Sequence, residues 1–421
     1  MNQLKQCNSL YVGFSGGLDS TVLLYALISE PSLASKITAI YIDHGLSHNA
    51  SQWQAHCEKI CHQFGVAFKA HRVYVKQNAN IEDQARQARY NVFHALIKAN
   101  DVLILGHHQD DQAETVLLQL FRGAGIEGLS AMVDWRSFSQ GYVARPLLAH
   151  SRSILEDYAK QQKLIWIEDE SNLDCSYTRN FLRQQVIPLI QTRWLSLNTN
   201  LARTAHHCQQ AQSNLYDLAC TDYPNLNEIK NKLALEPLKK LNLARKQNVL
   251  RAWLKKNITY LPDTKVFNRL IHEVLEASED KIPELSWKDT CIYRYKNTLY
   301  LVKKQTSKNT SSIRWPNFPE PLKLPYSLGF LKAIATSAGL VIPENAHVEI
   351  RFRQGGEKFY WHRQTKNLKK LLQEWCIPPW VRDQIPLMYI NQQLAAVADY
   401  AISDNFYQSS TNSCYQLQWD Y

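Results

Sequence analysis

Short runs of aliphatic, β-branched and aromatic residues alternate with amphipathic segments through the first 150 residues of the chain. Runs of this length and composition are typical of strands, and the recurring apolar positions between them are spaced as on one face of a helix. The predicted strands are 10–14 (LYVGF), 37–44 (ITAIYIDH), 67–75 (AFKAHRVYV) and 101–108 (DVLILGHH), and the predicted helices are 20–28, 51–64 and 82–99. This alternation predicts an α/β fold, a parallel sheet with helices on both faces.

The pattern changes after residue 150. Residues 151–215 predict helices, including one over 177–194 that continues into a second from Leu197, and 230–281 predict further helices with recurring basic pairs. The stretch CIYRYKNTLYLVKK predicts a hairpin that turns at Lys296-Asn297, and the polar, proline-containing QTSKNTSSIRWPNFPEP predicts a linker. Beyond the linker, a strand–turn–strand pattern, a short helix stopped by Pro378-Pro379 and a second hairpin predict a small α+β domain.

A chain of 421 residues is too long for one ordinary core, so we expect several domains. The predicted boundaries are 1–215 for the α/β catalytic domain, 216–308 for a basic, mainly helical domain, 309–344 for a linker and connecting segment, and 345–421 for the small α+β domain.

Composition narrows the class of protein. Hydrophobic residues make up 45% and charged residues 20%, which is typical of a globular protein in water. Apolar runs stay far below the roughly 20 residues that cross a bilayer, and the N-terminal pattern is unlike a signal peptide. The nine cysteines are odd in number and contain no CxxC pair, which favours reduced thiols. We therefore expect a cytoplasmic protein without membrane contact.

The positive charge is unevenly distributed. Residues 1–215 hold 19 basic and 18 acidic side chains, whereas the remaining 206 residues hold 29 and 20. Evenly solvated surfaces are one explanation. The asymmetry also fits a catalytic domain for small molecules with appended domains that bind a polyanion.

The stretch FSGGLDSTV follows the first predicted strand and opens the first predicted helix. Adjacent glycines let backbone N–H groups approach a ligand, and a helix N-terminus favours negative charge, so the turn predicts a phosphate site. Neither GxxxxGK[ST] nor GxGxxG is present. An ordinary capped turn is the alternative. The candidate phosphate ligands are Ser15, Gly16, Gly17, Leu18, Asp19 and Ser20.

Further polar clusters follow the second and fourth predicted strands, at the edge where ligands bind to parallel sheets. Asp43 is a candidate contact for a nucleoside or a metal, with helix capping as the alternative. Asp111 and Glu114 lie three apart at a helix start and therefore on one face. A structural zinc site at His107, His108, Asp110 and Asp111 is disfavoured because adjacent histidines rarely point the same way, and helix capping by the acidic residues is a second alternative.

The string Ser15 to Ser20 resembles the PP-loop of the N-type ATP pyrophosphatases, which cleave ATP between its α- and β-phosphates and transfer AMP to a substrate oxygen. The resemblance implies that the loop holds the departing pyrophosphate and that Asp19 lies close to a Mg²⁺ ion. An acidic residue in a phosphate loop is reasonable if a metal lies between them.

Three further strings, GHHxDDxxET, EDxSNxDxxxxRNxxR and ARxxRY, resemble the tRNA(Ile)-lysidine synthetase family. So does RFRQGGEKF followed by KKLLQEWCIPPWVRDQIPLMY near the C-terminus, whereas residues 216–340 match only in their basic, helical character. The resemblance implies ATP and Mg²⁺ as cofactors and, as substrates, free lysine and an isoleucine tRNA with a CAU anticodon. It places lysine at Asp111 and Glu114.

These residues suit that chemistry. The lysine ε-amine has a pKa of about 10.4 and is protonated at neutral pH, so a carboxylate pair can hold the ammonium and accept its proton. Arg86 and Arg89 suit contact with the triphosphate or the activated base, and Arg179 and Arg183 suit contact with tRNA phosphate or the nucleotide. The predicted catalytic residues are Asp19, Asp111, Glu114 and Arg86.

Alternatives remain at this point. A PP-loop tRNA thiolase is disfavoured because its chemistry generally needs paired cysteines. A nucleotide- or tRNA-binding protein without catalysis is disfavoured because Asp19, Asp111 and Glu114 are all present. The basic helices suit RNA or a second copy of the chain, so a homodimer stays open.

Overall fold

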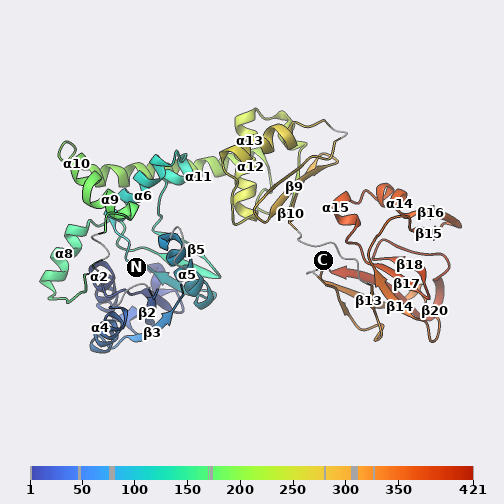
Figure 1. The fold of residues 1–421 in the computed structure, drawn as a ribbon, viewed down its shortest axis with the longest axis horizontal. Coiled ribbons are helices and arrows are strands. Elements are labelled where there is room, and N and C mark those ends of the chain that lie inside the picture. Colours follow the sequence, from blue (N-terminus) through green and yellow to red (C-terminus); the bar gives the residue numbers. More distant parts are fainter. Residues whose placement is uncertain are drawn as a thin grey trace. The chain divides into compact units, whose positions relative to one another are not determined.

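The computed structural model describes residues 2–45, 49–74, 81–168, 170, 174–278, 281–304, 312–325 and 328–420. The chain divides into two compact units, Met1–Thr221 and Asp222–Tyr421 (Figure 1). We describe each unit separately.

The first unit contains a six-stranded sheet in the order β3-β2-β1-β4-β6-β5. The first five of these strands run parallel and β5 is antiparallel to β6, which confirms the predicted parallel sheet and adds an unpredicted hairpin. The bounds are β1 Leu10–Gly13, β2 Ile37–Asp43, β3 Ala67–Arg72, β4 Val102–Ile104, β5 Trp135–Phe138 and β6 Gly141–Ala144. The chain order reverses direction on either side of β1, so the loops after β1 and β4 meet at the carboxyl edge, where a crevice forms in such sheets.

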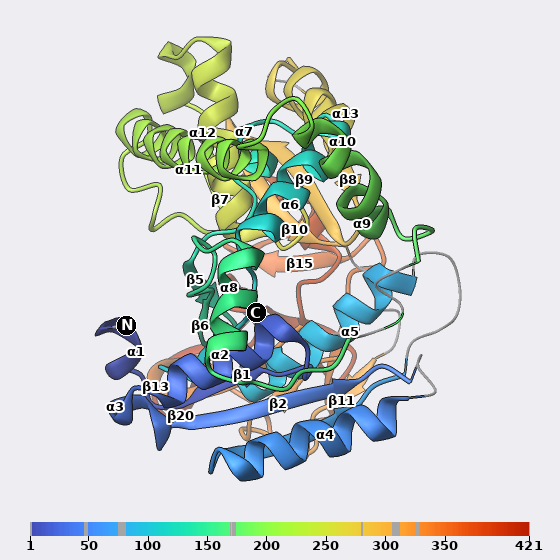
Figure 2. The same cartoon turned by 90° about the vertical axis from the view of Figure 1, so that its left-hand side faces the viewer.

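Helices cover both faces of this sheet. One face shares a core with α2 (Leu18–Ile28), α4 (Ala50–Gln63) and α8 (Arg152–Gln161). The other face is covered by α5 (Ile81–Leu96): Phe93 on this helix and Ile97 directly after it pack against Ile40 and Leu103. Figure 2 shows α4 and α5 on opposite sides of β2. The central strands are buried on both faces because their residues are almost all aliphatic.

A helical segment completes the unit. α9 (Thr178–Phe181), a π-helical turn (Leu182–Val186) and α10 (Ile187–Gln191) form one run, and α11 (Leu197–Asp222) follows. The two helices predicted from residue 177 onward are thus present. Gln209 on α11 donates from Nε2 to the carbonyls of Ser130 and Met132, at 2.8 and 2.9 Å, and so fixes the helix to the segment after α7 (Ile126–Leu129). The first unit also contains two short helices, α1 (Asn2–Lys5) and α3 (Pro31–Ala34), and the 13-residue α6 (Gln109–Phe121).

The second unit begins with helices and a four-stranded antiparallel sheet in the order β7-β10-β9-β8. The hairpin at Lys296-Asn297 is confirmed, and both residues have positive φ (45° and 58°), as tight hairpin turns require. One expectation was wrong: 230–281 is not wholly helical, because Lys232–Ala234 pairs with β10 as strand β7. The bounds are η3 Pro237–Lys240, α12 Leu243–Asn257, α13 Thr264–Arg269, the π-helical η4 Leu270–Leu275, β8 Glu284–Trp287, β9 Thr290–Tyr295 and β10 Thr298–Lys303.

The C-terminal part contains three antiparallel sheets, ordered β11-β14-β17-β18-β19, β12-β13-β20 and β15-β16. Within the predicted linker and connecting segment, the described residues include three strands of these sheets, among them the 11-residue β13. The bounds are β11 Ile313–Arg314, β12 Leu322–Lys323, β13 Phe330–Leu340, β14 Val348–Arg351, β15 Lys358–Trp361, β16 Gln364–Asn367, α14 Leu368–Glu374, α15 Pro379–Arg382, β17 Leu387–Ile390, β18 Gln393–Val397, β19 Ala401–Ile402 and β20 Tyr407–Asp420.

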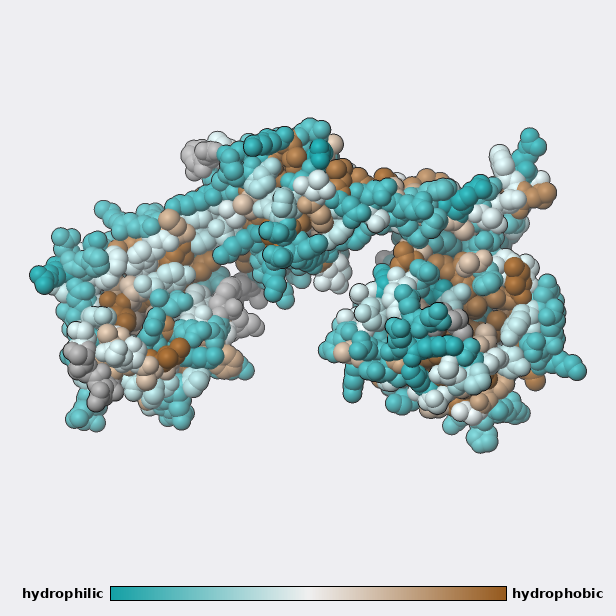
Figure 3. Space-filling view, turned by 180° about the vertical axis from the view of Figure 1, so that it is seen from behind, coloured by the Kyte–Doolittle hydropathy of each residue, from teal (hydrophilic) through white to brown (hydrophobic). Residues whose placement is uncertain are grey.

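Figure 3 shows hydrophilic residues dominating the face in view, with apolar residues in scattered groups. Among the described residues, none of the helices combines the length and the apolar content that a membrane span requires.

Candidate active site

The glycine turn joins β1 to α2 and is ordered by its own serines. Ser20 Oγ donates to the Gly17 carbonyl at 3.0 Å and accepts from the Ser15 backbone N–H at 3.3 Å. Gly16 has φ +78° and Gly17 is the N-cap of α2 without a side-chain cap. The N-cap of α2 therefore leaves the first N–H groups of the helix without a side-chain hydrogen bond, and unpaired N–H groups at a helix start are suited to binding anions.

A cavity of about 780 Å³ lies at the carboxyl edge of the sheet. It is bounded by the glycine turn, the ends of β2 and β4, the start of α6 and, further along the chain, Trp166, Ile167, Glu168, Glu170, Tyr177 and Arg183. The structure brings most of the predicted site residues to this one cavity: Ser15, Gly17, Leu18, Asp19, Ser20, Asp43, Arg89, Asp111 and Arg183 line it. Gly16, Arg86, Glu114 and Arg179 are not among the residues that line it.

Asp43 ends β2 at the rim of the cavity. Its Oδ1 accepts from the Gly45 backbone N–H at 2.8 Å, and its Oδ2 lies 3.6 Å from Arg72 Nε. The N-cap of α4 is Asn49, so Asp43 does not cap that helix. The helix-capping alternative for Asp43 was therefore wrong.

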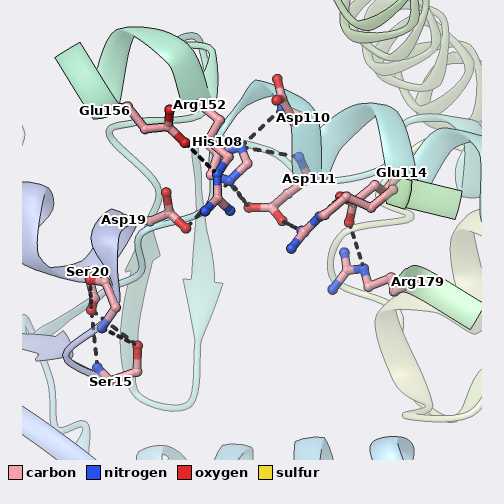
Figure 4. Close-up of polar contacts among 12 residues, drawn as sticks. Ser15, Asp19, Ser20, His108, Asp110, Asp111, Glu114, Arg152, Glu156 and Arg179 are labelled. Carbon is pink, nitrogen blue, oxygen red and sulfur yellow. Dashed lines mark hydrogen bonds and ion pairs between the residues drawn. The ribbon is translucent and has the colours of Figure 1, made fainter. Parts of the chain in front are cut away.

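His108 caps α6 and was assigned no role from the sequence. Its Nδ1 accepts from the backbone N–H groups of Asp110 and Asp111, at 3.2 and 3.4 Å, while Asp111 Oδ2 accepts from the His108 backbone N–H at 3.1 Å. This reciprocal pair is a capping box with histidine in place of serine. The His108 side chain is 1% exposed and lies between Asp19 and Asp111 (Figure 4).

Asp111 and Glu114 are joined by arginine. Arg183 Nε contacts Glu114 Oε1 at 2.6 Å, and Arg183 Nη2 contacts Asp111 Oδ1 at 3.3 Å. Arg179 Nε lies 3.4 Å from the other Glu114 oxygen, and its Nη2 donates to Thr115 Oγ1 at 3.0 Å. The two arginines are therefore paired with α6, and their predicted contact with tRNA or nucleotide stays a prediction.

The two carboxyl groups differ electrostatically. Burial raises the pKa of Glu114, which is fully buried, and Arg183 only partly offsets this. Burial also acts to raise the pKa of Asp111. The nearby His108, His107 and Arg179 and the His108 backbone N–H outweigh that effect and hold the pKa below its usual range. Two neighbouring carboxyls with opposite shifts are typical of sites that move protons.

A buried arginine was also missed. Arg145, 3% exposed, follows β6; its Nε donates to His107 Nδ1 at 3.2 Å and its Nη1 to the Val133 carbonyl at 2.7 Å. The contact fixes neutral His107 with its proton on Nε2, and His107 lines the cavity. A charged residue directly after the apolar strand GYVA was the available signal.

Arg86 and Arg89 lie one turn apart on α5. Their guanidinium carbons are 5.0 and 6.0 Å from the centre of the Tyr90 ring, and Arg89 reaches the cavity. Part of the EDxSNxDxxxxRNxxR string, Asp169 and residues 171–173, lies outside the described residues. Among the described residues, no cluster of three or more His, Cys, Asp or Glu side chains is arranged to hold a metal ion.

Comparison with known families matches three parts of the chain. The family model of the PP-loop domain matches residues 1–190, that of the TilS substrate binding domain matches 233–300, and that of the TilS substrate C-terminal domain matches 348–419. The fold and the glycine turn thus define a PP-loop protein of the ATP-using class.

Curated relatives match nearly the whole chain. The tRNA(Ile)-lysidine synthase of Legionella pneumophila (strain Paris) is 50% identical over 408 residues, covering 97% of this chain and 95% of that protein. The enzymes of the same name from Coxiella burnetii and Yersinia pestis are 38% and 37% identical, covering 94% and 99% of this chain and 89% and 95% of their own. The chain belongs to the tRNA(Ile)-lysidine synthase family.

A U34-tRNA thiolase from Methanococcus maripaludis aligns with 48% of this chain and 73% of its own, at 17% identity and a TM-score of 0.41.

Proposed function

We propose that this protein is an ATP-dependent tRNA-modifying ligase. It adenylates the 2-carbonyl oxygen of the wobble cytidine in the CAU anticodon of isoleucine tRNA. It then joins lysine to that carbon, giving lysidine, AMP and pyrophosphate. Membership of the family supports the reaction. The observation that carries it is one cavity lined both by a glycine turn for phosphates and by Asp111, which Arg183 joins to the buried Glu114.

In this proposal ATP lies along the carboxyl edge of the sheet. The N–H groups at the start of α2, with Ser15 and Ser20, hold the departing pyrophosphate, and Asp43 contacts the adenosine. Asp19 is suited to hold Mg²⁺: its Oδ1 is buried without a hydrogen-bond partner among the described residues, and carboxylate oxygen is a preferred Mg²⁺ ligand. The ion would neutralise charge on the phosphates.

Lysine binds at the start of α6. Its ammonium approaches Asp111 and replaces the 3.3 Å contact with Arg183, while the 2.6 Å contact between Arg183 and Glu114 persists. Asp111 then accepts a proton, which leaves a neutral amine. The amine nitrogen forms a bond to C2 of the cytosine as the bond from C2 to the AMP-bearing oxygen breaks, and AMP departs with that oxygen.

The remaining predicted residues act around this reaction. Arg86 and Arg89 contact the triphosphate or the activated base, with Arg89 at the cavity wall. The proposed domains are 1–215 for catalysis, 216–308 and 345–421 for binding tRNA, and 309–344 for connection. The basic excess after residue 215 supports tRNA binding there, because phosphate neutralisation dominates affinity for nucleic acid. The reaction takes place in the cytoplasm, where its tRNA substrate is found.

Thiolation is a poor second candidate. Burial raises the pKa of both Cys57 and Cys61 to about 12, so neither is a thiolate near neutral pH.

The test uses the full-length protein with ATP, Mg²⁺, radiolabelled lysine and an unmodified isoleucine tRNA with a CAU anticodon. We expect acid-precipitable label that resists mild alkali, which would hydrolyse an aminoacyl ester. Methionine tRNA with the same anticodon is the matched control and should stay unlabelled. Pyrophosphate release without label would contradict lysine as the nucleophile. The absence of both would contradict the proposed reaction.

A further inference from the structure

His108 has one polar atom that its capping role leaves unused. Because Nδ1 accepts from two backbone N–H groups, the ring proton is on Nε2. Nε2 lies 3.6 Å from Asp19 Oδ2 and 3.5 Å from Asp111 Oδ2. It is buried and makes no hydrogen bond with the described residues. One buried donor thus faces two carboxylates at distances too long for a good bond to either.

The two carboxylates belong to different parts of the cavity. Asp19 is in the first turn of α2, beside the glycine turn, whereas Asp111 is in the first turn of α6 and contacts Arg183. Both line the cavity, and Figure 4 shows the His108 ring between them. The His108 ring thus lies within 3.6 Å of a carboxylate at the glycine turn and of a carboxylate at the start of α6.

We propose that His108 is a positioning residue that couples nucleotide binding to lysine binding, an inference that rests on the proposed function. In the structure, the His108 N–H lies between two acceptors, Asp19 and Asp111. A nucleotide bound with Mg²⁺ would engage Asp19 Oδ1, which has no hydrogen-bond partner among the described residues, through the ion and so draw Asp19 away from His108. The His108 N–H then bonds fully to Asp111 and holds it oriented for the lysine ammonium.

A buried donor without a hydrogen bond costs free energy, so the folded state becomes more stable when either Asp19 or Asp111 accepts a full hydrogen bond from the His108 N–H. Nucleotide binding lets the His108 N–H form a full hydrogen bond to Asp111. The Asp111 carboxylate is then already oriented when lysine binds, so less free energy is spent on orienting it. Linkage requires the effect to be reciprocal: lysine must tighten nucleotide binding by the same factor. The expected factor is about fivefold or more, at the lower end of ordinary coupling between sites.

Two substitutions separate the capping role of His108 from the coupling role. His108→Asn keeps an acceptor in place of Nδ1, and asparagine is among the best N-caps, but it has no group where Nε2 lies. His108→Gln can place an amide N–H near the position of Nε2 but is a poor N-cap. A purely structural role predicts that His108→Asn keeps both the stability and the coupling of the wild type, and that His108→Gln loses both. Coupling through Nε2 predicts instead that His108→Asn keeps the stability but loses the coupling, whereas His108→Gln loses stability but keeps part of the coupling.

The experiment is equilibrium dialysis of radiolabelled lysine against the full-length protein, with and without α,β-methylene-ATP and Mg²⁺. The wild type should bind lysine at least about fivefold more tightly with the nucleotide present. His108→Asn should melt at an unchanged temperature and bind lysine with a coupling factor near one. His108→Gln should melt lower and retain part of the coupling.

A wild-type coupling factor of one would overturn the inference without any variant, and leave the proposed function standing. Full coupling in His108→Asn would also overturn it. If the wild type binds no lysine under either condition, both the inference and the proposed lysine site are overturned. The reciprocal measurement, nucleotide affinity with and without lysine, must yield the same factor.

Discussion

Gly16 lies directly against the thiol of Cys57. A Cβ atom on Gly16 would be 2.8 Å from Cys57 Sγ, closer than real Cβ contacts allow, and Gly16 has φ +78°, a conformation that other residues rarely adopt. Cys57 is fully buried on α4, so it has little freedom to move. The position of the glycine turn is therefore restricted by its contact with α4, a helix about 40 residues further along the chain.

We expect Gly16→Ala to reduce ATP-dependent pyrophosphate release by a factor of about 100 or more. A substituent there must shift the turn, and the N–H groups lose their alignment on the phosphates. The free energy of unfolding should fall by roughly 1–3 kcal/mol from the strained φ and the contact. Pyrophosphate release and urea unfolding measure the two effects.

Gly17→Ala is the matched control, because Gly17 has φ −76° and its added Cβ would come no closer than 3.5 Å to any neighbour. The double variant Gly16→Ala, Cys57→Ala removes the steric contact but not the strained φ and should recover only part of the stability. Full activity in Gly16→Ala would contradict the assigned role of the turn.

Asp111→Asn should retain adenylation of tRNA and lose lysine transfer by about 100-fold or more. The amide oxygen can still accept from the His108 N–H, so the capping box persists, but the neutral side chain neither attracts the ammonium nor takes its proton. Pyrophosphate release and labelled lysine in tRNA, measured on the same samples, separate the two steps. An equal loss in both assays would show that Asp111 acts on ATP instead.

Arg183→Met should reduce lysine transfer at pH 7 about tenfold or more, with partial recovery at higher pH. Burial already raises the pKa of Glu114, and removing its 2.6 Å partner raises it further, so the carboxyl group becomes protonated nearer neutral pH. The free energy of unfolding should fall by roughly 1–3 kcal/mol, less than for a fully buried pair because the Arg183 side chain is one-third exposed.

Arg269→Met is the control, since it removes a comparable 2.7 Å contact, Arg269 to Glu273, on an exposed helix face. Its stability should change by no more than about 0.5 kcal/mol. If the pH–rate profile of Arg183→Met has the same shape as that of the wild type, Arg183 does not control the protonation of Glu114.

His107 should make the fold sensitive to acid. Burial, with the charges of Arg145 and Arg89, lowers the pKa of His107 to about 3, whereas an unfolded histidine has a pKa of about 6.5. Between these values the unfolded chain binds a proton that the folded chain does not, so stability falls as pH decreases below 6.5. The slope should be up to about 1.4 kcal/mol per pH unit.

His107→Asn supplies the comparison, because its amide oxygen can still accept from Arg145. Urea unfolding at pH 6.5 and at pH 5 should show a smaller loss of stability in the variant than in the wild type. Equal losses would mean that His107 is protonated in the folded state and that Arg145 does not hold it neutral.

Much of the catalytic domain was predictable because its signals are local. Apolar runs specified β1 to β4, and recurring apolar positions specified α2, α4 and α5. Strand polarity then placed the glycine turn, Asp43 and His107 at one edge of the sheet, since parallel strands end together. The short strand β7, three residues long, has too little pattern to be recognised and exists because β10 offers it a partner.

The sequence by itself determined the kind of chemistry: a phosphate-binding turn, a carboxylate pair on one helix face and a basic second half. Which groups pair was decided only by the tertiary structure. Arg183 meets Glu114 from 69 residues away, Arg145 meets His107 from 38, and His108 Nε2 lies 3.6 Å from Asp19 Oδ2. Such contacts depend on how helices pack over a finished sheet, and no local pattern encodes the partner of a buried charge.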